Sequence, residues 1–411
     1  MPLDLLTRLD PLRRLRCPHC FGQFAAFQMH IRCTSDQCLS DVSRQVEDPI
    51  LTRTLTGRER SPDSGRAFRA PWWTDPIGDP RRRLRGWLDV LVLPGALTCP
   101  HCQQPADSRL CPRCHRPLPA RLLDHRKSGS ITIFGPQAVG KTTYLTVLLQ
   151  EIKKAPDTPR RLGLRPLDDE VRRRYREEYY EITYGHARHA PTVTLELNRR
   201  VLEPLVYELK TNAPGPGPIV SFCDLAGEDW EQKPELLRRE APHLIQQTQG
   251  LLFLIDPLRI PQVRAGMELT EEEATVRLAD YVEDADKLAD FFPRLPARTP
   301  LAVVLNKIDR WGPLLAKDTA LHQIACSAPA GEPDRALDLT VHEEVRSALR
   351  RWGQTEFLDR LESDFPVHQF FACSALGDAA QLRPDHTAPR PTPLLVERAA
   401  IWLLGRQGLL R

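Results

Sequence analysis

One eight-residue segment has the composition and spacing of a loop that binds phosphate. It reads Gly135-Pro-Gln-Ala-Val-Gly140-Lys141-Thr142 and matches the pattern G-x-x-x-x-G-K-[ST] between an apolar strand and a helix. Backbone N–H groups of such a loop can surround phosphate oxygens, aided by the positive end of the helix. We expect Lys141 to bridge the β- and γ-phosphates and the Thr142 hydroxyl to ligate Mg²⁺. The predicted nucleotide contacts here are Gly135, Gln137, Ala138, Val139, Gly140, Lys141, Thr142 and Thr143.

A second motif, Asp224-Leu-Ala-Gly227, follows an apolar run. We expect Asp224 to reach the Mg²⁺ through water and the Gly227 N–H to reach the γ-phosphate. A threonine that closes over the metal should precede this motif. Thr192 and Thr194 are both candidates, and ordinary strand residues are the alternative interpretation. Thr192 is favoured because it follows a proline just before a strand-like run, so the predicted Mg²⁺ ligands are Thr142, Asp224 and Thr192.

A third motif can distinguish purine bases. Asn306-Lys307-Ile308-Asp309 follows an apolar run, and the Asp309 carboxylate can accept hydrogen bonds from guanine N1–H and its exocyclic amine. Adenine presents an acceptor at N1, which leaves the carboxylate unpaired at a cost of ~1–3 kcal/mol. Lys307 can lie over the purine ring, while Asn306 can brace the phosphate loop. Further along, in Ser374-Ala375-Leu376, the Ala375 N–H can donate to guanine O6.

Eight of the eleven cysteines fall into four close pairs. A C-x-x-C pair places two thiolates on a tight turn, and a second pair completes a tetrahedral zinc site. Disulfides are the alternative, but nothing in the sequence suggests export. The pairs that are neighbours in sequence are expected to share an ion, which gives two zinc sites: Cys17, Cys20, Cys33 and Cys38 form one, and Cys99, Cys102, Cys111 and Cys114 form the other. Nearby histidines, His19, His101 and His115, are interpreted as turn residues.

The hydrophobic pattern predicts an α/β fold. From residue 130, apolar strands alternate with amphipathic helices, which is typical of a mostly parallel sheet flanked by helices. Residues 1–127 form the predicted zinc-binding region, with a Pro- and Arg-rich connector, and 128–411 form the predicted P-loop domain. Expected strands are 131–134, 205–209, 219–223, 251–255, 301–305 and 367–372, with a short one at 88–93. Expected helices are 141–154, 167–182, 235–247, 268–292, 341–365 and 393–404.

Composition bounds the protein's location and partners. No apolar run approaches the ~18 residues needed to span a bilayer, and the N-terminus has charges where a signal peptide needs an apolar stretch. We therefore expect a cytoplasmic protein without a membrane span. Residues 1–127 carry 21 Lys and Arg against 13 Asp and Glu, and the remainder carries 36 against 41. The basic region can contact nucleic acid, an acidic protein or the partner domain, and a solvated arginine-rich surface is the alternative.

The motifs GPQAVGKT, DLAG, NKID and SAL, in this order, resemble those of the Ras-like and translation-factor-like class of P-loop GTPases over about residues 129–405. A cysteine-rich region that ends in CPRCHRPLP and leads into such a domain looks more narrowly like bacterial "double-GTPase" proteins. Members of that group are associated with predicted conflict or defence systems. The resemblance implies a molecular switch that binds GTP or GDP with Mg²⁺ and acts on a protein partner.

The sequence departs from this class at positions that matter for hydrolysis. Glu228 occupies the position of the water-orienting glutamine, and Gln137 stands where a glycine is usual. A carboxylate can orient water, but its charge repels the γ-phosphate. We therefore expect slow hydrolysis through Lys141, Glu228 and Thr192, aided by an arginine from a partner or a second copy in a homo-oligomer. The alternatives are a nucleic-acid-binding module gated by nucleotide and a nucleotide-binding scaffold without turnover.

Overall fold

The computed structural model describes residues 14–32, 68–69, 108–114, 116–119, 122, 125, 127–154, 162–184, 204–210, 215–225, 246–278, 280–292, 295–296, 298–327, 334–377 and 391–410. The chain divides into two compact units. Met1–Ser128 and Gly215–Ile219 form one, called here the cysteine unit. Gly129–Pro214 and Val220–Arg411 form the other, called the sheet unit. Each unit is described by itself.

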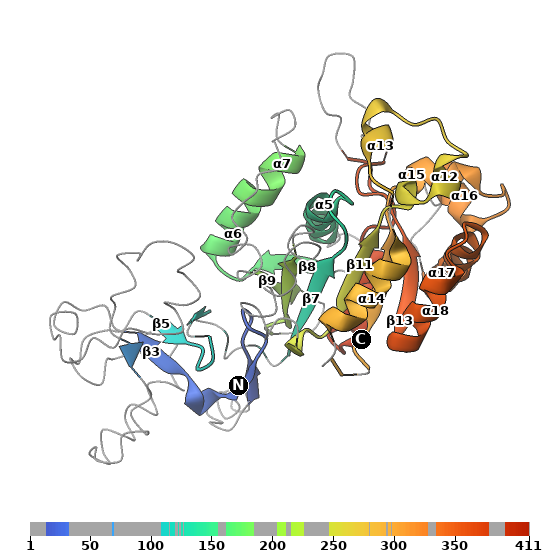
Figure 1. Cartoon of the computed structure of the whole chain (residues 1–411). Helices are drawn as coiled ribbons and strands as arrows, with labels where there is room; N and C mark the ends of the chain where they lie inside the picture. The colour runs from blue at the N-terminus through green and yellow to red at the C-terminus, as the bar shows by residue number, and fades with distance from the viewer. Residues whose placement is uncertain are drawn as a thin grey trace, which may run out of the picture. The chain divides into compact units, whose positions relative to one another are not determined.

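A seven-stranded sheet forms the centre of the sheet unit (Figure 1), with the strand order β13-β12-β11-β7-β10-β9-β8. β11 runs parallel to β7 and to β12, and β12 runs parallel to β13, whereas β8 and β9 are antiparallel at one edge. The predicted α/β class with a mostly parallel sheet flanked by helices is therefore confirmed. The strands are β7 (Ser128–Phe134), β8 (Gly163–Pro166), β9 (Leu205–Lys210), β10 (Ile219–Asp224), β11 (Leu251–Ile255), β12 (Leu301–Leu305) and β13 (His368–Ala372).

The helices come from the segments between these strands. They are α5 (Lys141–Lys154), α6 (Asp169–Tyr175), the π-helical turn η7 (Arg176–Tyr180), α7 (Glu181–Tyr184), η8 (Pro257–Arg259), α12 (Pro261–Arg264), α13 (Glu271–Thr275), α14 (Tyr281–Phe291), α15 (Ile308–Trp311), η9 (Gly312–Leu314), α16 (Ala320–Cys326), α17 (Arg335–Arg351), α18 (Thr355–Asp364) and α19 (Arg398–Arg406). Among the described residues, none of these helices is both long and apolar enough to cross a membrane.

Helices cover both faces of the sheet, so the central strands are apolar throughout. Every residue of β11 and β12 is buried, as expected for a parallel sheet between helices. Successive residues of β13 point to opposite faces. Phe370 lies against His342 of α17, with ring centroids 5.6 Å apart, and Phe371 lies against Trp402 of α19, at 5.9 Å. On the α19 face, the Tyr144 hydroxyl of α5 donates to the Val396 carbonyl at 2.9 Å.

Two long helices predicted from the sequence are each broken into two. The predicted helix 341–365 is interrupted at Gly353, whose φ of +75° ends α17 in a left-handed turn. The predicted helix 268–292 is interrupted after α13, and Asp280 caps the start of α14 by accepting from the N–H groups of Val282 and Glu283. Local capping residues therefore end a helix inside an amphipathic segment that hydrophobic periodicity alone would predict to be one helix.

The remaining differences concern short elements. β8, which pairs with β9 at the edge of the sheet, was not predicted because its sequence Gly-Leu-Arg-Pro shows no clear alternation. The predicted helix 167–182 begins at Asp169 and passes through the π-helical turn η7 before it ends in α7. The predicted strand 88–93 and most of the predicted helix 235–247 lie outside the described residues.

Short antiparallel strands make up the described part of the cysteine unit. β1 (Arg14–Arg16) pairs with β2 (Gln23–Ala25), and a short 3₁₀ helix, η1 (Ala26–Gln28), follows. A second small sheet has the order β4-β3-β5-β6, in which β3 and β5 are antiparallel, with Arg32 opposite Ser108. Its strands are β3 (His30–Arg32), β4 (Phe68–Arg69), β5 (Ser108–Leu110) and β6 (Pro117–Leu118).

Candidate functional site

The loop between β7 and α5, residues 135–140, here called the glycine loop, needs glycine at both ends. Gly135 has a φ of +147°, and a Cβ there would lie 2.4 Å from the Leu254 carbonyl oxygen of β11. Gly140 has a φ of +87°, and a Cβ there would lie 3.2 Å from the Asn306 amide nitrogen. Both conformations favour glycine. Between them, Gln137 and Ala138 are exposed and Val139 is buried.

Lys141, the first residue of α5, folds back over this loop. Its Nζ donates to the carbonyl oxygens of Gly135 and Pro136, each at 2.7 Å, and the residue is 7% exposed. The ammonium group is therefore held inside the curve of the loop at the N-terminal end of a 14-residue helix. The positive charge of the lysine and the positive end of the helix dipole lie at the same place, and together they attract an anion.

Thr142 and Asp224 meet at the carboxyl edge of the sheet. The Thr142 hydroxyl donates to Asp224 Oδ2 at 3.0 Å, although the two residues are 82 positions apart. Thr142 is the second residue of α5, and Asp224 is the last residue of β10 and is buried. A hydroxyl and a carboxylate are hard oxygen ligands of the kind that Mg²⁺ prefers. These two predicted metal ligands are thus close together and have suitable chemistry for that ion.

The Asn306 side chain joins the end of β12 to the glycine loop. Its amide nitrogen donates to the Val139 carbonyl at 3.1 Å, and its Oδ1 accepts from the Lys307 N–H at 2.9 Å and from the Cys373 thiol at 3.6 Å. The Trp311 indole donates to the Asn306 carbonyl at 2.7 Å. The predicted bracing of the loop by Asn306 is therefore present as a direct hydrogen bond.

Lys307 adopts a left-handed conformation with a φ of 61°. Its Nζ lies 2.7 Å from Oδ2 of Asp256, whose side chain is 1% exposed. Asp256 directly follows β11, and its Oδ1 accepts from the Leu258 N–H at 3.0 Å. The Tyr281 hydroxyl donates to the Asp256 carbonyl at 2.6 Å. A buried carboxylate with several partners therefore fixes the lysine side chain.

Asp309, in α15, and the segment 374–376 follow the neighbouring strands β12 and β13. The Ile308 N–H donates to the Cys373 carbonyl at 2.9 Å, which connects the turn after β12 to the turn after β13. Ser374 and Ala375 are buried, whereas Asp309 and Leu376 are partly exposed. The Ser374 hydroxyl accepts from the Gly377 N–H at 2.9 Å and so shapes the turn. Burial raises the pKa of Cys373 well above its ordinary value, and the charge of Asp309 contributes.

Four of the predicted switch and catalytic residues lie outside the described residues: Thr192, Thr194, Gly227 and Glu228. The predicted nucleotide-site residues that the structure does describe all belong to the sheet unit. They lie at the C-terminal ends of β7, β10, β12 and β13 or at the start of α5. In an open α/β sheet, ligands usually bind at that edge.

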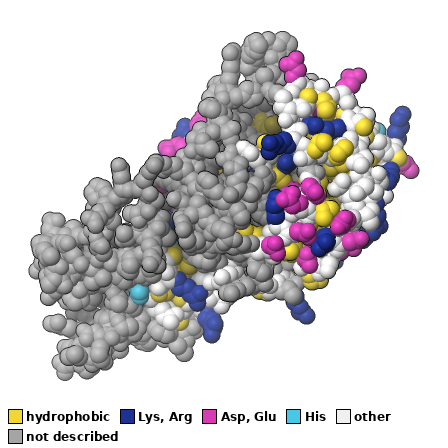
Figure 2. All heavy atoms as spheres, viewed as in Figure 1, with side chains coloured by type: hydrophobic (Ala, Val, Ile, Leu, Met, Phe, Trp, Pro, Cys, Tyr) yellow, Lys and Arg dark blue, Asp and Glu magenta, His cyan; other side chains and the backbone are white. Residues whose placement is uncertain are grey.

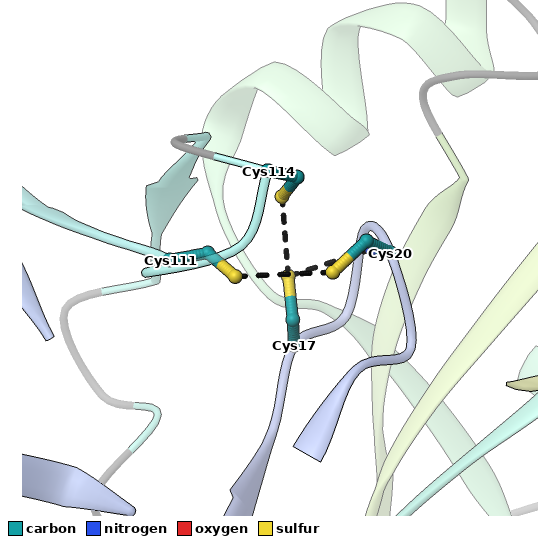
Figure 3. A group of neighbouring side chains, drawn as sticks. All are labelled: Cys17, Cys20, Cys111 and Cys114. Carbon is teal, nitrogen blue, oxygen red and sulfur yellow. Dashed lines mark hydrogen bonds between the residues drawn. The ribbon is translucent and has the colours of Figure 1, made fainter. Parts of the chain in front are cut away.

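A separate candidate metal centre lies in the cysteine unit (Figure 3). The sulfur atoms of Cys17, Cys20, Cys111 and Cys114 all lie within 4.8 Å of one another. The Cys17–Cys114 and Cys20–Cys111 sulfur distances are 3.7 and 3.8 Å. A tetrahedral zinc site with Zn–S bonds of about 2.3 Å has S···S distances of about 3.8 Å. The four thiols are therefore spaced to hold one zinc ion.

Two similar turns present these thiols. In the first knuckle (residues 17–22), the Cys17 N–H donates to the Gly22 carbonyl at 2.9 Å, and in the second (residues 111–116), the Cys111 N–H donates to the Arg116 carbonyl at 3.0 Å. Backbone N–H groups also point at sulfur: His19 N lies 3.3 Å from Cys17 Sγ, and Arg113 N lies 3.4 Å from Cys111 Sγ. Such donors stabilise thiolates, which are the form that binds metal.

The grouping of the cysteines corrects the sequence prediction. Cys17 and Cys20 were expected to share an ion with Cys33 and Cys38, and Cys111 and Cys114 with Cys99 and Cys102. The structure instead brings the first and last pairs together. The reason is the antiparallel pairing of β3 with β5, which brings the segment before β3 and the segment after β5 to the same end of the small sheet. Cys33, Cys38, Cys99 and Cys102 lie outside the described residues.

No protein-family model matches this chain, and neither does any curated protein at the level taken as significant.

Two residues at the sheet edge were not predicted to take part. Asp256 could have been found by the same reasoning as Asp224, because it too follows a fully apolar strand at the carboxyl edge. Cys373 has no role in the sequence-based prediction of the site, yet its thiol donates to Asn306 Oδ1. The sequence gives no local signal for that contact, since the two residues are 67 positions apart.

Proposed function

We propose that this chain is a guanine-nucleotide-binding protein of the P-loop GTPase class that acts as a molecular switch. The observation that carries the proposal is the hydrogen bond from Asn306 to the Val139 carbonyl. It ties the segment proposed to recognise the base to the loop proposed to hold the phosphates, so a single nucleotide can contact both. The Lys141 and Thr142–Asp224 contacts support the phosphate end of the same site.

Each residue has a distinct role in this proposal. N–H groups of the glycine loop and Lys141 bind the β- and γ-phosphates. Thr142 and Asp224 hold Mg²⁺, which neutralises charge on the phosphate oxygens when it is bound. The Asp309 carboxylate accepts from guanine N1–H and the exocyclic amine, and the Ala375 N–H donates to O6. Lys307, fixed by Asp256, covers the purine ring.

Hydrolysis is proposed to be slow and dependent on a partner. Thr192 and Glu228 are the residues proposed to close over the metal and to orient water, and a carboxylate performs that task less well than an amide because it repels the γ-phosphate. An arginine from a protein partner or from a second copy of the chain would offset this charge. A role in a bacterial conflict or defence system rests on the family resemblance alone.

Zinc is proposed to stabilise the cysteine unit, because none of the strands β1–β6 exceeds three residues and a small core needs such a cross-link. One ion would bind Cys17, Cys20, Cys111 and Cys114. We propose a second ion on the other four paired cysteines. The support is the order of residues along the chain. Cys33 directly follows β3 and Cys102 precedes β5, and Arg32 of β3 lies opposite Ser108 of β5 in this antiparallel pair. The second group would then be Cys33, Cys38, Cys99 and Cys102.

Competition against a fluorescent GDP analogue in magnesium buffer tests the nucleotide proposal. GTP and GDP should displace the analogue, and ATP and ADP should not. Asp309→Asn should weaken guanine binding at least tenfold. It should also favour xanthine nucleotides, because the asparagine amide can donate to the C2 oxygen that replaces the guanine amine. Equal displacement by adenine nucleotides would make the chain an ATP-binding protein, and absence of any binding would leave a scaffold without nucleotide function.

A further inference from the structure

The described part of the cysteine unit is strongly cationic. Its described side chains include five arginines and Lys127 but no aspartate or glutamate; the arginines are Arg14, Arg16, Arg109, Arg113 and Arg116. One zinc ion with four thiolates carries a formal charge of −2, so the cationic excess remains when the metal centre is filled. On the face drawn in Figure 2, the coloured atoms at the lower left include dark blue side chains and no magenta ones, whereas both colours occur over the sheet unit.

Two segments carry arginines close to the first knuckle. Arg14 and Arg16 lie on one face of β1, on either side of the buried Leu15. The Arg16 guanidinium donates to the Phe21 carbonyl at 2.8 Å. From the second knuckle, the stem of Arg113 crosses Gly22, where an added Cβ would lie 2.6 Å from its Cδ.

Arg116 precedes a residue that contacts the first knuckle. It is followed by Pro117, whose carbonyl lies 3.0 Å from His19 Nε2. Arg14 and Arg113 are exposed, and Arg16 and Arg116 are partly exposed. The metal centre thus brings together two distant segments that carry four arginines, here called the arginine surface (Arg14, Arg16, Arg113 and Arg116).

We propose that the arginine surface binds the phosphate backbone of nucleic acid. Guanidinium groups pair with phosphate oxygens through two parallel hydrogen bonds and keep their charge at any physiological pH. The net charge of residues 1–127, with 21 Lys and Arg against 13 Asp and Glu, is also positive, which favours a polyanionic partner. Backbone contacts carry no base information, so binding should be independent of sequence.

This inference is separate from the proposed nucleotide site, because all four arginines belong to the cysteine unit. The test is fluorescence anisotropy of labelled mixed-sequence 20-mers, as single-stranded RNA, single-stranded DNA and duplex DNA, with the zinc-loaded full chain. About four phosphate contacts predict that raising salt from 50 to 200 mM weakens binding by about 50-fold for single strands and about 150-fold for a duplex.

The decisive variant is Arg14→Glu with Arg113→Glu, since both side chains are exposed. It should weaken binding at least tenfold at 50 mM salt. The slope of log Kd against log salt concentration should fall by the contribution of about two phosphate contacts. The matched control is Arg172→Glu with Arg351→Glu, two exposed arginines of the sheet unit, which should bind as the wild type does. Zinc content and binding of the fluorescent GDP analogue should be unchanged in both variants, which establishes that each is folded.

Three results would overturn the proposal. The first is no anisotropy change with any of the three probes at 50 mM salt, which would point to an acidic protein as the partner instead. The second is an equal loss of binding in the control variant, because it would reflect net charge alone. The third is binding by the Arg14→Glu, Arg113→Glu variant with wild-type affinity and salt dependence. Failure to bind guanine nucleotide would leave the inference intact, since the two sites are tested by different probes.

Discussion

Lys307 Nζ and Asp256 Oδ2 are 2.7 Å apart, and this ion pair links the turns that follow two adjacent parallel strands, β11 and β12. The aspartate side chain is almost completely buried, whereas 30% of the lysine side chain remains exposed. A buried carboxylate is costly unless it is paired. The pair therefore holds Lys307 in one orientation, with its left-handed backbone, beside the proposed base site.

Replacing Asp256 with asparagine should weaken nucleotide binding without abolishing it. The substitution keeps the size of the side chain but removes the charge that holds Lys307, so the lysine loses its fixed position over the proposed purine ring. A loss of about 1–1.5 kcal/mol corresponds to a roughly tenfold weaker Kd. Titration of the fluorescent GDP analogue measures it. Asp359→Asn, at an exposed position of α18, is the control and should bind normally; equal affinities in all three proteins would contradict a positioning role for Asp256.

The zinc content of cysteine variants distinguishes the grouping in the structure from the grouping predicted for pairs that are neighbours in sequence. Cys17→Ser and Cys111→Ser should each lose one zinc equivalent per chain, because each removes a ligand of the same ion. The double variant should then lose only that one equivalent. If Cys17 and Cys111 belonged to different sites, the double variant would lose two. Elemental analysis of proteins purified in parallel gives the answer, and Cys326→Ser, which changes an exposed free cysteine, controls for handling.

Three glycines should respond differently to alanine. Gly135→Ala should destabilise the fold by about 2–4 kcal/mol, since its Cβ would overlap the Leu254 carbonyl and its φ is positive. Gly215 has a φ of +95° but open space around it, so Gly215→Ala should lower the free energy of unfolding by about 1 kcal/mol. Gly405→Ala, in open space within α19, should stabilise by about 0.5–1 kcal/mol. Urea unfolding measures all three, and a Gly135→Ala cost no larger than that of Gly215→Ala would contradict the close packing at the glycine loop.

The contribution of Glu273 to stability should depend on pH. Two hydrogen bonds at 2.8 Å from Arg310 lower the pKa of Glu273 from its ordinary 4.5 to about 2. A carboxyl group whose pKa is lowered by folding stabilises the protein fully above its unfolded pKa, and this stabilisation is lost as pH falls towards the folded value. Glu273→Gln should therefore cost about 1–2 kcal/mol between pH 6 and 8, after allowance for solvent screening.

That difference between wild type and Glu273→Gln should shrink steadily below about pH 4.5, as followed by urea unfolding at a series of pH values. Glu283→Gln serves as the matched control, because Glu283 pairs with Lys287 on an exposed helix surface where its side chain is 62% exposed. It should leave the free energy of unfolding nearly unchanged throughout. A Glu273→Gln difference that stayed constant down to pH 3 would contradict the lowered pKa.

Features that depend on neighbouring residues were predictable from the sequence. Helix α5 begins and ends at the residues that the pattern indicated, and six of the seven strands of the large sheet were expected. The glycine loop was recognisable because its two glycines and its lysine act within one short turn. The breaks at Gly353 and Asp280 also had local signals, a glycine and a capping aspartate, but the amphipathic pattern that continues across each break concealed them.

Contacts between distant segments were decided by the tertiary structure alone. Cys17 and Cys114 are 97 positions apart, and their shared cluster depends on which strands pair and in which direction. A C-x-x-C pair specifies the turn and the metal but not its partner pair, since any two such turns have the same local chemistry. The Asp256–Lys307 pair likewise exists because β11 and β12 are adjacent in the sheet. Sequence by itself therefore determined the chemical groups and their local geometry, and strand order determined which of them meet.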